Sequence, residues 1–459
     1  MKSSIWMVLL AALVAGPACG DNAAPGDGPG DGEDPIADGL RVRQVSTIPH
    51  EQVRGLALAA LAGDRLAIAR ADASGDAFCP DCLDLPASEC PALCIRSTIS
   101  VAVLDPATGG LAPSRPVATV FPASFDHSVD QLEIVALGGD RLGVAWLDCD
   151  DARCGGLAAK RSCAARYTTV DLATGAVGTP RTLYEGWFGD LSLAFDPVSR
   201  RLLAVIGKDL AFGAGLFRAL FDETGATTLS PWTALGSTAA RSPALLATGG
   251  AFLVVADDWA PTSAPLATPC PQSCDCLASV GIDLATGGLF AFHVGDGPDR
   301  SERIADGVDD RGFYGRREQI AVIDAGGRTM IADTQSIDRS AEIFTNDGTG
   351  WVPQLRSPAP IPMWIGALGT AERLAWIGAR PEPGGFATVQ RLVAGVVTED
   401  AEHHAAFTEP VDGAVLVTLP VATPAGVTTT YLVRGVFAPR VGPQLGWDRF
   451  ELLAVDAVW

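Results

Sequence analysis

The sequence predicts an all-β fold assembled from one repeated unit, and three observations carry this prediction. A motif of two apolar runs flanking a tight polar turn recurs seven times along the chain. A second turn, rich in Asp and Gly, follows most copies. No amphipathic helical pattern of convincing length interrupts them. A unit that cannot bury its own apolar faces must stack on its neighbours, so the repeat predicts the architecture.

The first hairpin of each unit is expected from runs of Val, Ile, Leu and Ala with Gly or Asp at the turn. The clearest copies are LAALAGDRLAIA at 58–69 and EIVALGGDRLGVAW at 133–146. Looser copies occur at 193–207, 244–257, 321–333, 365–378 and 406–420, the last with its turn near Asp412.

The second hairpin is expected to turn at D-x-A-T-G, in residues 105–109, 171–175 and 283–287, with variants at 222–225 and 346–350. Asp supplies a local hydrogen bond there and Gly a positive φ. Two hairpins give four strands per unit, here called A to D in chain order. Four-stranded units at this spacing are typical of a β-propeller, so the sequence predicts one propeller of about seven blades over residues 40–459.

The two ends of that domain suggest how the ring closes. RVRQVSTIP at 41–49 precedes the first A strand, and FELLAVD at 450–456 resembles a C strand with no D strand after it. Pairing the N-terminal strand with the last blade would remove two exposed sheet edges. Residues 420–449 would then be a long B–C connection. In the alternative, 428–436 is the C strand and the terminal strand is an addition.

The first 18 residues have the pattern of a signal peptide. Met1-Lys2 provides the positive start, and the apolar run Ile5–Ala15 is too short to span a bilayer. The run ends at Gly16-Pro17-Ala18-Cys19, which resembles the lipobox of bacterial lipoproteins. The chain as a whole therefore resembles a bacterial β-propeller lipoprotein.

This resemblance implies that the signal peptide is removed and that Cys19 carries acyl chains that anchor the protein to a membrane. Gly20 rather than Asp follows Cys19, which favours the outer membrane. An ordinary secreted protein is the alternative. Residues 19–39 consist mainly of Gly, Pro, Asp and Ala and have little to bury, so they are predicted to be a disordered tether.

Eleven cysteines are present, and ten remain if Cys19 is acylated. In an exported protein these are disulfide candidates, with a zinc site in the first cluster as the alternative. Two of the three clusters contain an odd number of cysteines. At least one disulfide must therefore join two different clusters, or two thiols stay free. All three are expected in B–C connections, on the face that also carries the D–A connections. The clusters are Cys79, Cys82, Cys90 and Cys94; Cys149, Cys154 and Cys163; and Cys270, Cys274 and Cys276.

Three predicted D–A connections pair histidines with carboxylates. They are His50 with Glu51, His127 with Asp126, and the pair His403 and His404, which follow Glu402. Imidazoles and carboxylates that meet at the mouth of a central channel could bind a divalent metal or act as acid and base. The alternative is that these are polar side chains of connecting loops.

The net charge and the absence of catalytic motifs limit the classes of function that the sequence supports. A net charge of −21 disfavours a nucleic-acid partner. TNDGTGW at 345–351 resembles the Asp-box of sialidase propellers, with its Gly and Trp out of register by one; G-x-S-x-G and H-E-x-x-H are absent. The sequence predicts a monomeric, lipid-anchored envelope propeller that binds an unknown protein or glycan, or acts as a scaffold, without catalysis or cofactor. The alternative is a propeller hydrolase or lyase with a His/carboxylate or metal site at the channel mouth.

Overall fold

The computed structural model describes residues 40–48, 53–74, 96–120, 132–149, 162–188, 190–208, 215–237, 240–258, 287–306, 317–335, 341–357, 364–381, 390–397, 407–411, 414–437 and 447–457. Contacts divide the chain into Met1–Pro35 and Ile36–Trp459, and all described residues belong to the second unit. Regular structure in the described part is entirely β-strand. Within these ranges, no helix is long and apolar enough to cross a membrane.

The described strands form six sheets, and most neighbours in a sheet are also neighbours in sequence. One sheet has five strands: β2 (Val53–Leu61), β3 (Arg65–Ser74), β4 (Arg96–Asp105), β5 (Gly110–Leu111) and β6 (Arg115–Val120). The next has four: β7 (Leu132–Gly138), β8 (Arg141–Cys149), β9 (Ser162–Asp171) and β10 (Arg181–Trp187).

Three further four-stranded sheets follow. The first comprises β11 (Asp190–Asp196), β12 (Arg201–Lys208), β13 (Gly215–Asp222) and β14 (Thr228–Leu235). The second comprises β15 (Arg241–Ala247), β16 (Phe252–Asp258), β17 (Gly288–Val294) and β18 (Arg300–Asp306). The third comprises β19 (Arg317–Asp324), β20 (Thr329–Gln335), β21 (Ala341–Asn346) and β22 (Trp351–Ser357).

The sixth sheet has eight strands. It comprises β23 (Trp364–Thr370), β24 (Leu374–Pro381), β25 (Gln390–Val397), β26 (Phe407–Val411), β27 (Ala414–Thr423), β28 (Gly426–Phe437), β29 (Trp447–Ala457) and β1 (Leu40–Ile48). The N-terminal strand β1 pairs with β29 from Leu40 opposite Ala457 to Ile48 opposite Phe450.

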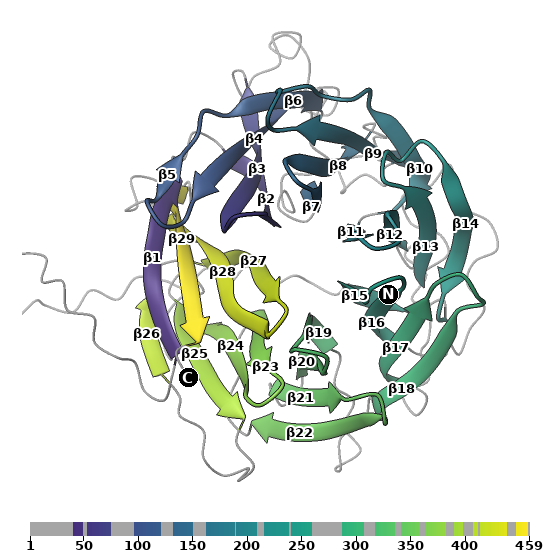
Figure 1. The fold of residues 1–459 in the computed structure, drawn as a ribbon, viewed down its shortest axis with the longest axis vertical. Helices are drawn as coiled ribbons and strands as arrows, with labels where there is room; N and C mark the ends of the chain where they lie inside the picture. The colour runs from purple at the N-terminus through teal and green to yellow at the C-terminus, as the bar shows by residue number, and fades with distance from the viewer. Residues whose placement is uncertain are drawn as a thin grey trace, which may run out of the picture. The chain divides into compact units, whose positions relative to one another are not determined.

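The sheets follow one another around a ring, which makes the domain a single all-β propeller (Figure 1). The first strands of successive sheets contact each other in the order β2, β7, β11, β15, β19 and β23, and β27 contacts both β23 and β2. Six sheets appear where the sequence predicted about seven blades. The reason is that β23 also pairs with β28, through Gly369 with Val427 and Thr370 with Gly426, so two predicted units share one sheet.

Burial between neighbouring sheets explains the uninterrupted apolar runs in the second strands. Residues 202–206 of β12 are 0% exposed although they point alternately to opposite faces of their sheet. Leu202 and Ile206 pack toward the β7–β10 sheet, whereas Leu203 and Val205 pack toward the β15–β18 sheet. Strands that are buried on both faces need not alternate with polar residues.

Six of the seven predicted first hairpins are confirmed, and the seventh is wrong. The segment 406–420 is divided between β26, which pairs with β25, and β27, which pairs with β28. The last hairpin instead turns at Thr423–Gly426, where Gly426 takes a positive φ of 122°. Asp412-Gly413 resembles a hairpin turn in sequence, but it joins two strands that have different partners. The long connection predicted at 420–449 is therefore wrong, because this segment contains the end of β27, all 12 residues of β28 and the start of β29.

The second hairpins turn as predicted in four units but not in the fourth. There β17 pairs with both β16 and β18, so the turn between its third and fourth strands lies at 295–299. The D-x-A-T-G segment at 283–287 comes before β17 rather than after it. GLFAFHV at 288–294 is the strand because its apolar side chains fill both neighbouring interfaces.

Candidate functional site

The strands of each sheet end on two opposite sides, here called the turn edge and the loop edge, and the connections on these two sides differ in length. The turn edge carries the short connections between first and second strands, at 62–64, 139–140, 197–200, 248–251, 325–328, 371–373 and 424–425. The loop edge is the opposite edge, where second strands end and third strands begin. The connections 75–95, 150–161 and 259–287 leave and rejoin their strands at the loop edge, so the long insertions begin and end at this edge.

The three cysteine clusters follow this division. The first lies between β3 and β4, the second spans the ends of β8 and β9, and the third lies between β16 and β17. All these strand pairs meet their connections at the loop edge. Only Cys149 and Cys163 fall within described strands; the other candidates, and Cys19, lie outside the described residues. Cys163 is 3% exposed and stands opposite Cys149 in the β8–β9 register.

The predicted histidine and carboxylate residues all lie outside the described residues, but the strands around them are described. His50 and Glu51 lie between β1 and β2, and Asp126 and His127 lie between β6 and β7. Both connections leave and rejoin strands at the loop edge, and β2 contacts β7.

His403 and His404 do not fit this pattern. They lie between β25 and β26, not in a connection from a fourth strand to a first one. Val397, the last residue of β25, stands opposite Leu374 beside the 371–373 turn, so this connection begins at the turn edge. Their predicted place in a D–A connection is wrong. The error follows from the misassigned seventh hairpin, and it separates this pair from the other two candidate loops.

Aspartates recur where second strands reach the loop edge, a feature that the sequence interpretation missed. Asp257 and Asp333 are 0% exposed, and Asp258 is 8% exposed. The backbone N–H of Ser237 donates to both Asp258 carboxylate oxygens, at 3.0 and 3.1 Å, which ties the β14–β15 connection to β16. The sequence signal is an Asp closing an apolar run, as in VVADD and MIAD.

These carboxylates do not form a metal centre with other described residues. Within the described ranges, no group of three or more His, Cys, Asp and Glu side chains could hold a metal ion. The Asp258 contacts indicate a bracing role, since a buried carboxylate is stabilised by the hydrogen bonds that it accepts.

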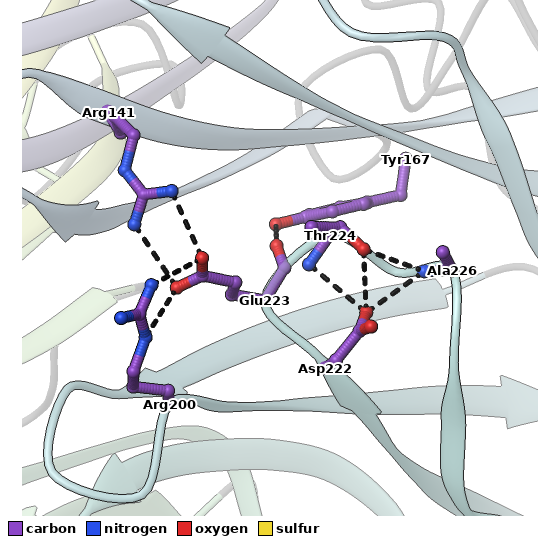
Figure 2. Close-up of polar contacts among 7 residues, drawn as sticks. All are labelled: Arg141, Tyr167, Arg200, Asp222, Glu223, Thr224 and Ala226. Carbon is purple, nitrogen blue, oxygen red and sulfur yellow. Dashed lines mark hydrogen bonds and ion pairs between the residues drawn. The ribbon is translucent and has the colours of Figure 1, made fainter.

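The turn edge carries a network that joins neighbouring sheets (Figure 2). The Glu223 carboxylate, in the β13–β14 turn, accepts hydrogen bonds from Arg141 of the β7–β10 sheet at 3.0 and 3.1 Å. Arg200, in the β11–β12 turn, donates to the same carboxylate at 2.5 and 3.0 Å. The hydrogen bonds from Arg141 and Arg200 lower the pKa of Glu223.

Two other groups complete this network. The Tyr167 hydroxyl donates to the Glu223 carbonyl oxygen at 2.8 Å, and burial followed by the charge of Glu223 raises the pKa of Tyr167. Asp222 accepts hydrogen bonds from Thr224 and from the Ala226 backbone N–H, as Figure 2 shows. Burial works against these bonds, but together with those from Thr227 they lower the pKa of Asp222. The bonds of Asp222 hold its own turn in shape, and the bonds of Glu223 with Arg141 and Tyr167 join that turn to the neighbouring sheet.

Similar contacts join the next pair of sheets. Arg218 of β13 donates to both carboxylate oxygens of Asp299, in the β17–β18 turn, at 2.7 and 2.8 Å. Arg201 of β12 pairs with Asp296 of the same turn. The turn edge is therefore occupied by structural contacts, which leaves the loop edge as the candidate functional face.

No protein-family model matches the chain, and no curated protein matches its sequence. Solved structures resemble it weakly. A protein of unknown function from Dyadobacter fermentans has 10% identity and a TM-score of 0.44, with 91% of this chain and 99% of that one covered. The GH93 α-L-arabinofuranosidase of Fusarium graminearum has 12% identity and a TM-score of 0.40, with 77% and 96% covered.

A sialidase of Trypanosoma rangeli, in complex with sialic acid, has 11% identity and a TM-score of 0.40, with 92% of this chain and 59% of that one covered. Similarities at this level carry no argument about activity. The assignment of the fold rests on the strand pairings described above.

Proposed function

We propose that the chain is a lipid-anchored cell-envelope propeller that binds a protein or glycan partner through its loop edge, without catalysis. One observation carries the proposal: the long connections, including those with all three cysteine clusters, meet their strands at the loop edge, whereas the turn edge is filled by short turns and ion pairs. Binding residues are commonly found on loops that a rigid scaffold positions.

The proposed scaffold has seven blades, with the N-terminal strand as the outer strand of the last one. Two findings support this. The halves of the eight-stranded sheet share only the two residue pairs between β23 and β28. Strand β1 pairs antiparallel with β29 over most of its length, just as the outer strand β26 pairs antiparallel with β25. A closed ring of this kind would leave few sheet edges exposed to unwanted pairing.

Anchoring through Cys19 is part of the proposal and rests on the lipobox-like sequence. We expect the full chain, expressed in a Gram-negative host and grown with an alkyne-tagged fatty acid, to incorporate the label and to fractionate with the outer membrane. Cys19→Ser should abolish the label because no other thiol becomes the new N-terminus. Cys154→Ser is the matched control and should be labelled as strongly as the wild type. Label that persists in Cys19→Ser would contradict the anchor.

The binding role can be tested at both edges. Residues 307–316 join β18 to β19 at the loop edge and contain no cysteine, so they can be replaced by a Gly-Ser linker. Val198, 73% exposed in a turn-edge hairpin, provides the control Val198→Glu. A glycan array and isolated envelope fragments serve as probes. Binding that is lost on loop replacement but kept in Val198→Glu supports the proposal; the reverse pattern, or no binding by the wild type, would overturn it.

The hydrolase or lyase alternative retains one favourable observation, the neighbouring loop-edge connections that carry His50, Glu51, Asp126 and His127. Elemental analysis of the purified protein distinguishes it from the proposal. A stoichiometric divalent metal that is lost in His127→Ala would favour the alternative and contradict a binding-only function.

A further inference from the structure

The two described cysteines stand opposite each other across one strand pair. Strands β8 and β9 pair antiparallel from Arg141 opposite Asp171 to Cys149 opposite Cys163, without a register shift. Opposite Cα atoms of an antiparallel pair lie about 4.5 or 5.5 Å apart, depending on the hydrogen-bonding position. Both separations fall within the roughly 4.4–6.8 Å that a disulfide bridges. The backbone register alone therefore permits a bond at this point.

The surroundings favour the bond as well. Cys163 is 3% exposed and belongs to a core cluster that includes Ala165 and Tyr167 of its own strand and Leu191 and Ile206 of the next sheet. Directly opposite residues of an antiparallel pair lie on the same face. The register therefore places both cysteines on the face that packs against β11 and β12. A disulfide there would be shielded from reductants and would close the 150–161 connection at its base.

We propose that Cys149 and Cys163 form a disulfide, and that Cys154 consequently pairs outside its own cluster. The bond would form by exchange with an oxidising protein disulfide. One thiolate attacks that disulfide to give a mixed disulfide, and the second thiolate then displaces the partner as a dithiol. The pair loses two protons and two electrons, which the partner receives.

Parity then limits the remaining crosslinks. With Cys149 and Cys163 joined, the first cluster keeps four cysteines, the third keeps three, and Cys154 stands alone between them. If all pair, Cys154 must reach either the β3–β4 connection or the β16–β17 connection. Both begin and end at the loop edge, so this second bond would join two long connections of the proposed binding face. This inference rests on the proposed export, because the cytosol keeps thiols reduced.

Trypsin separates the relevant cysteines, so peptide mapping under non-reducing conditions tests the pairing directly. Cleavage after Arg and Lys places Cys149 in 142–153, Cys154 in 154–160 and Cys163 in 162–166. The first cluster falls in 71–96 and the third in 242–300. We expect 142–153 linked to 162–166, and 154–160 linked to 71–96 or 242–300. In Cys154→Ser the first link should persist, and in Cys149→Ser it should be lost.

Mapping is done on full-length protein isolated from the envelope and on full-length protein refolded in a glutathione redox buffer. Cys163 found as a free thiol, or linked to 154–160, in both preparations would overturn the pairing. The expected link in refolded protein alone would instead uphold the pairing and contradict the proposed export. Cys154 found free in both would overturn the second bond while leaving the first.

Discussion

Glu223 shows at the scale of one residue how neighbouring sheets are held together. Its side chain is 15% exposed and accepts hydrogen bonds from two arginines that are 40% and 62% exposed. Its main-chain carbonyl accepts the hydroxyl of Tyr167, which is 0% exposed. A single residue of one turn thus connects two sheets through both its side chain and its backbone.

Glu223→Gln should therefore destabilise the fold. Hydrogen bonds to a charged group contribute about 1.5–3 kcal/mol, and the exposure of both arginines reduces this, so a loss of roughly 1–2 kcal/mol is expected at pH 7. Urea unfolding measures it. Glu185→Gln, at an exposed position of β10, is the control and should change stability little. Equal effects of the two substitutions would mean that the ion pairs contribute nothing.

The effect should also depend on pH in a defined direction. Since the pKa of Glu223 is lowered in the fold, its contribution is complete above its unfolded pKa of about 4.3 and is lost as pH falls through the folded value. The difference between wild type and Glu223→Gln should therefore shrink below about pH 4. A difference that grows on acidification would contradict this linkage.

Among the structural elements, the turns between third and fourth strands were partly predictable. Asp105 accepts the Ala107 backbone N–H at 2.9 Å and the Thr108 hydroxyl at 3.0 Å, as the D-x-A-T-G pattern implies. This chemistry is local, so it can be read from a few residues. That the same turns contact the preceding sheet was not predictable, because the partners of Glu223 and Asp299 are distant in sequence.

A local turn pattern in the sequence also gave a wrong prediction, because it fits two different strand pairings equally well. Asp412-Gly413 has turn chemistry, yet only the pairing of β27 with β28 decides which strands it joins. This error also affected the candidate site. His403 and His404 were assigned to a D–A connection, but they lie in the connection between β25 and β26, which begins at the turn edge. The aspartates at the loop edge were visible in the sequence, but their burial depends on packing between sheets.

At the element scale, burial should separate two otherwise similar ion pairs of the β17–β18 turn. The arginines of both pairs are buried, Arg218 at 8% and Arg201 at 10% exposed, but Asp299 is 20% exposed whereas Asp296 is 89% exposed. Asp299→Asn should cost about 3 kcal/mol, because it breaks a pair in which both the guanidinium and the carboxylate are largely buried and joined by two hydrogen bonds. Asp296→Asn should cost well under about 1 kcal/mol, because the Asp296 carboxylate is hydrated and Arg201 also donates to the Gly250 carbonyl oxygen. Thermal unfolding of the two variants compares them, and the opposite ranking would show that burial does not control these contacts.

For the whole molecule, we propose that β1, the strand nearest the proposed anchor, also completes the propeller. Leu40 and Ile48, at the two ends of β1, are 1% and 0% exposed. Leu40 belongs to a core cluster that includes residues of β23 and β24, and Ile48 belongs to one that includes residues of β2 and β3. This one strand therefore contributes to the core on both sides of the proposed last blade.

The most direct test compares the thermal unfolding of two truncated chains, 40–459 and 49–459. The first lacks only the predicted signal and tether segments and should unfold with the midpoint of the full chain. The second also loses β1, including two buried side chains worth about 1.5–3 kcal/mol each. At about 1 °C per kcal/mol for a domain of roughly 420 residues, its midpoint should fall by several degrees, if it folds at all. Equal midpoints for the two chains would contradict closure of the propeller by β1.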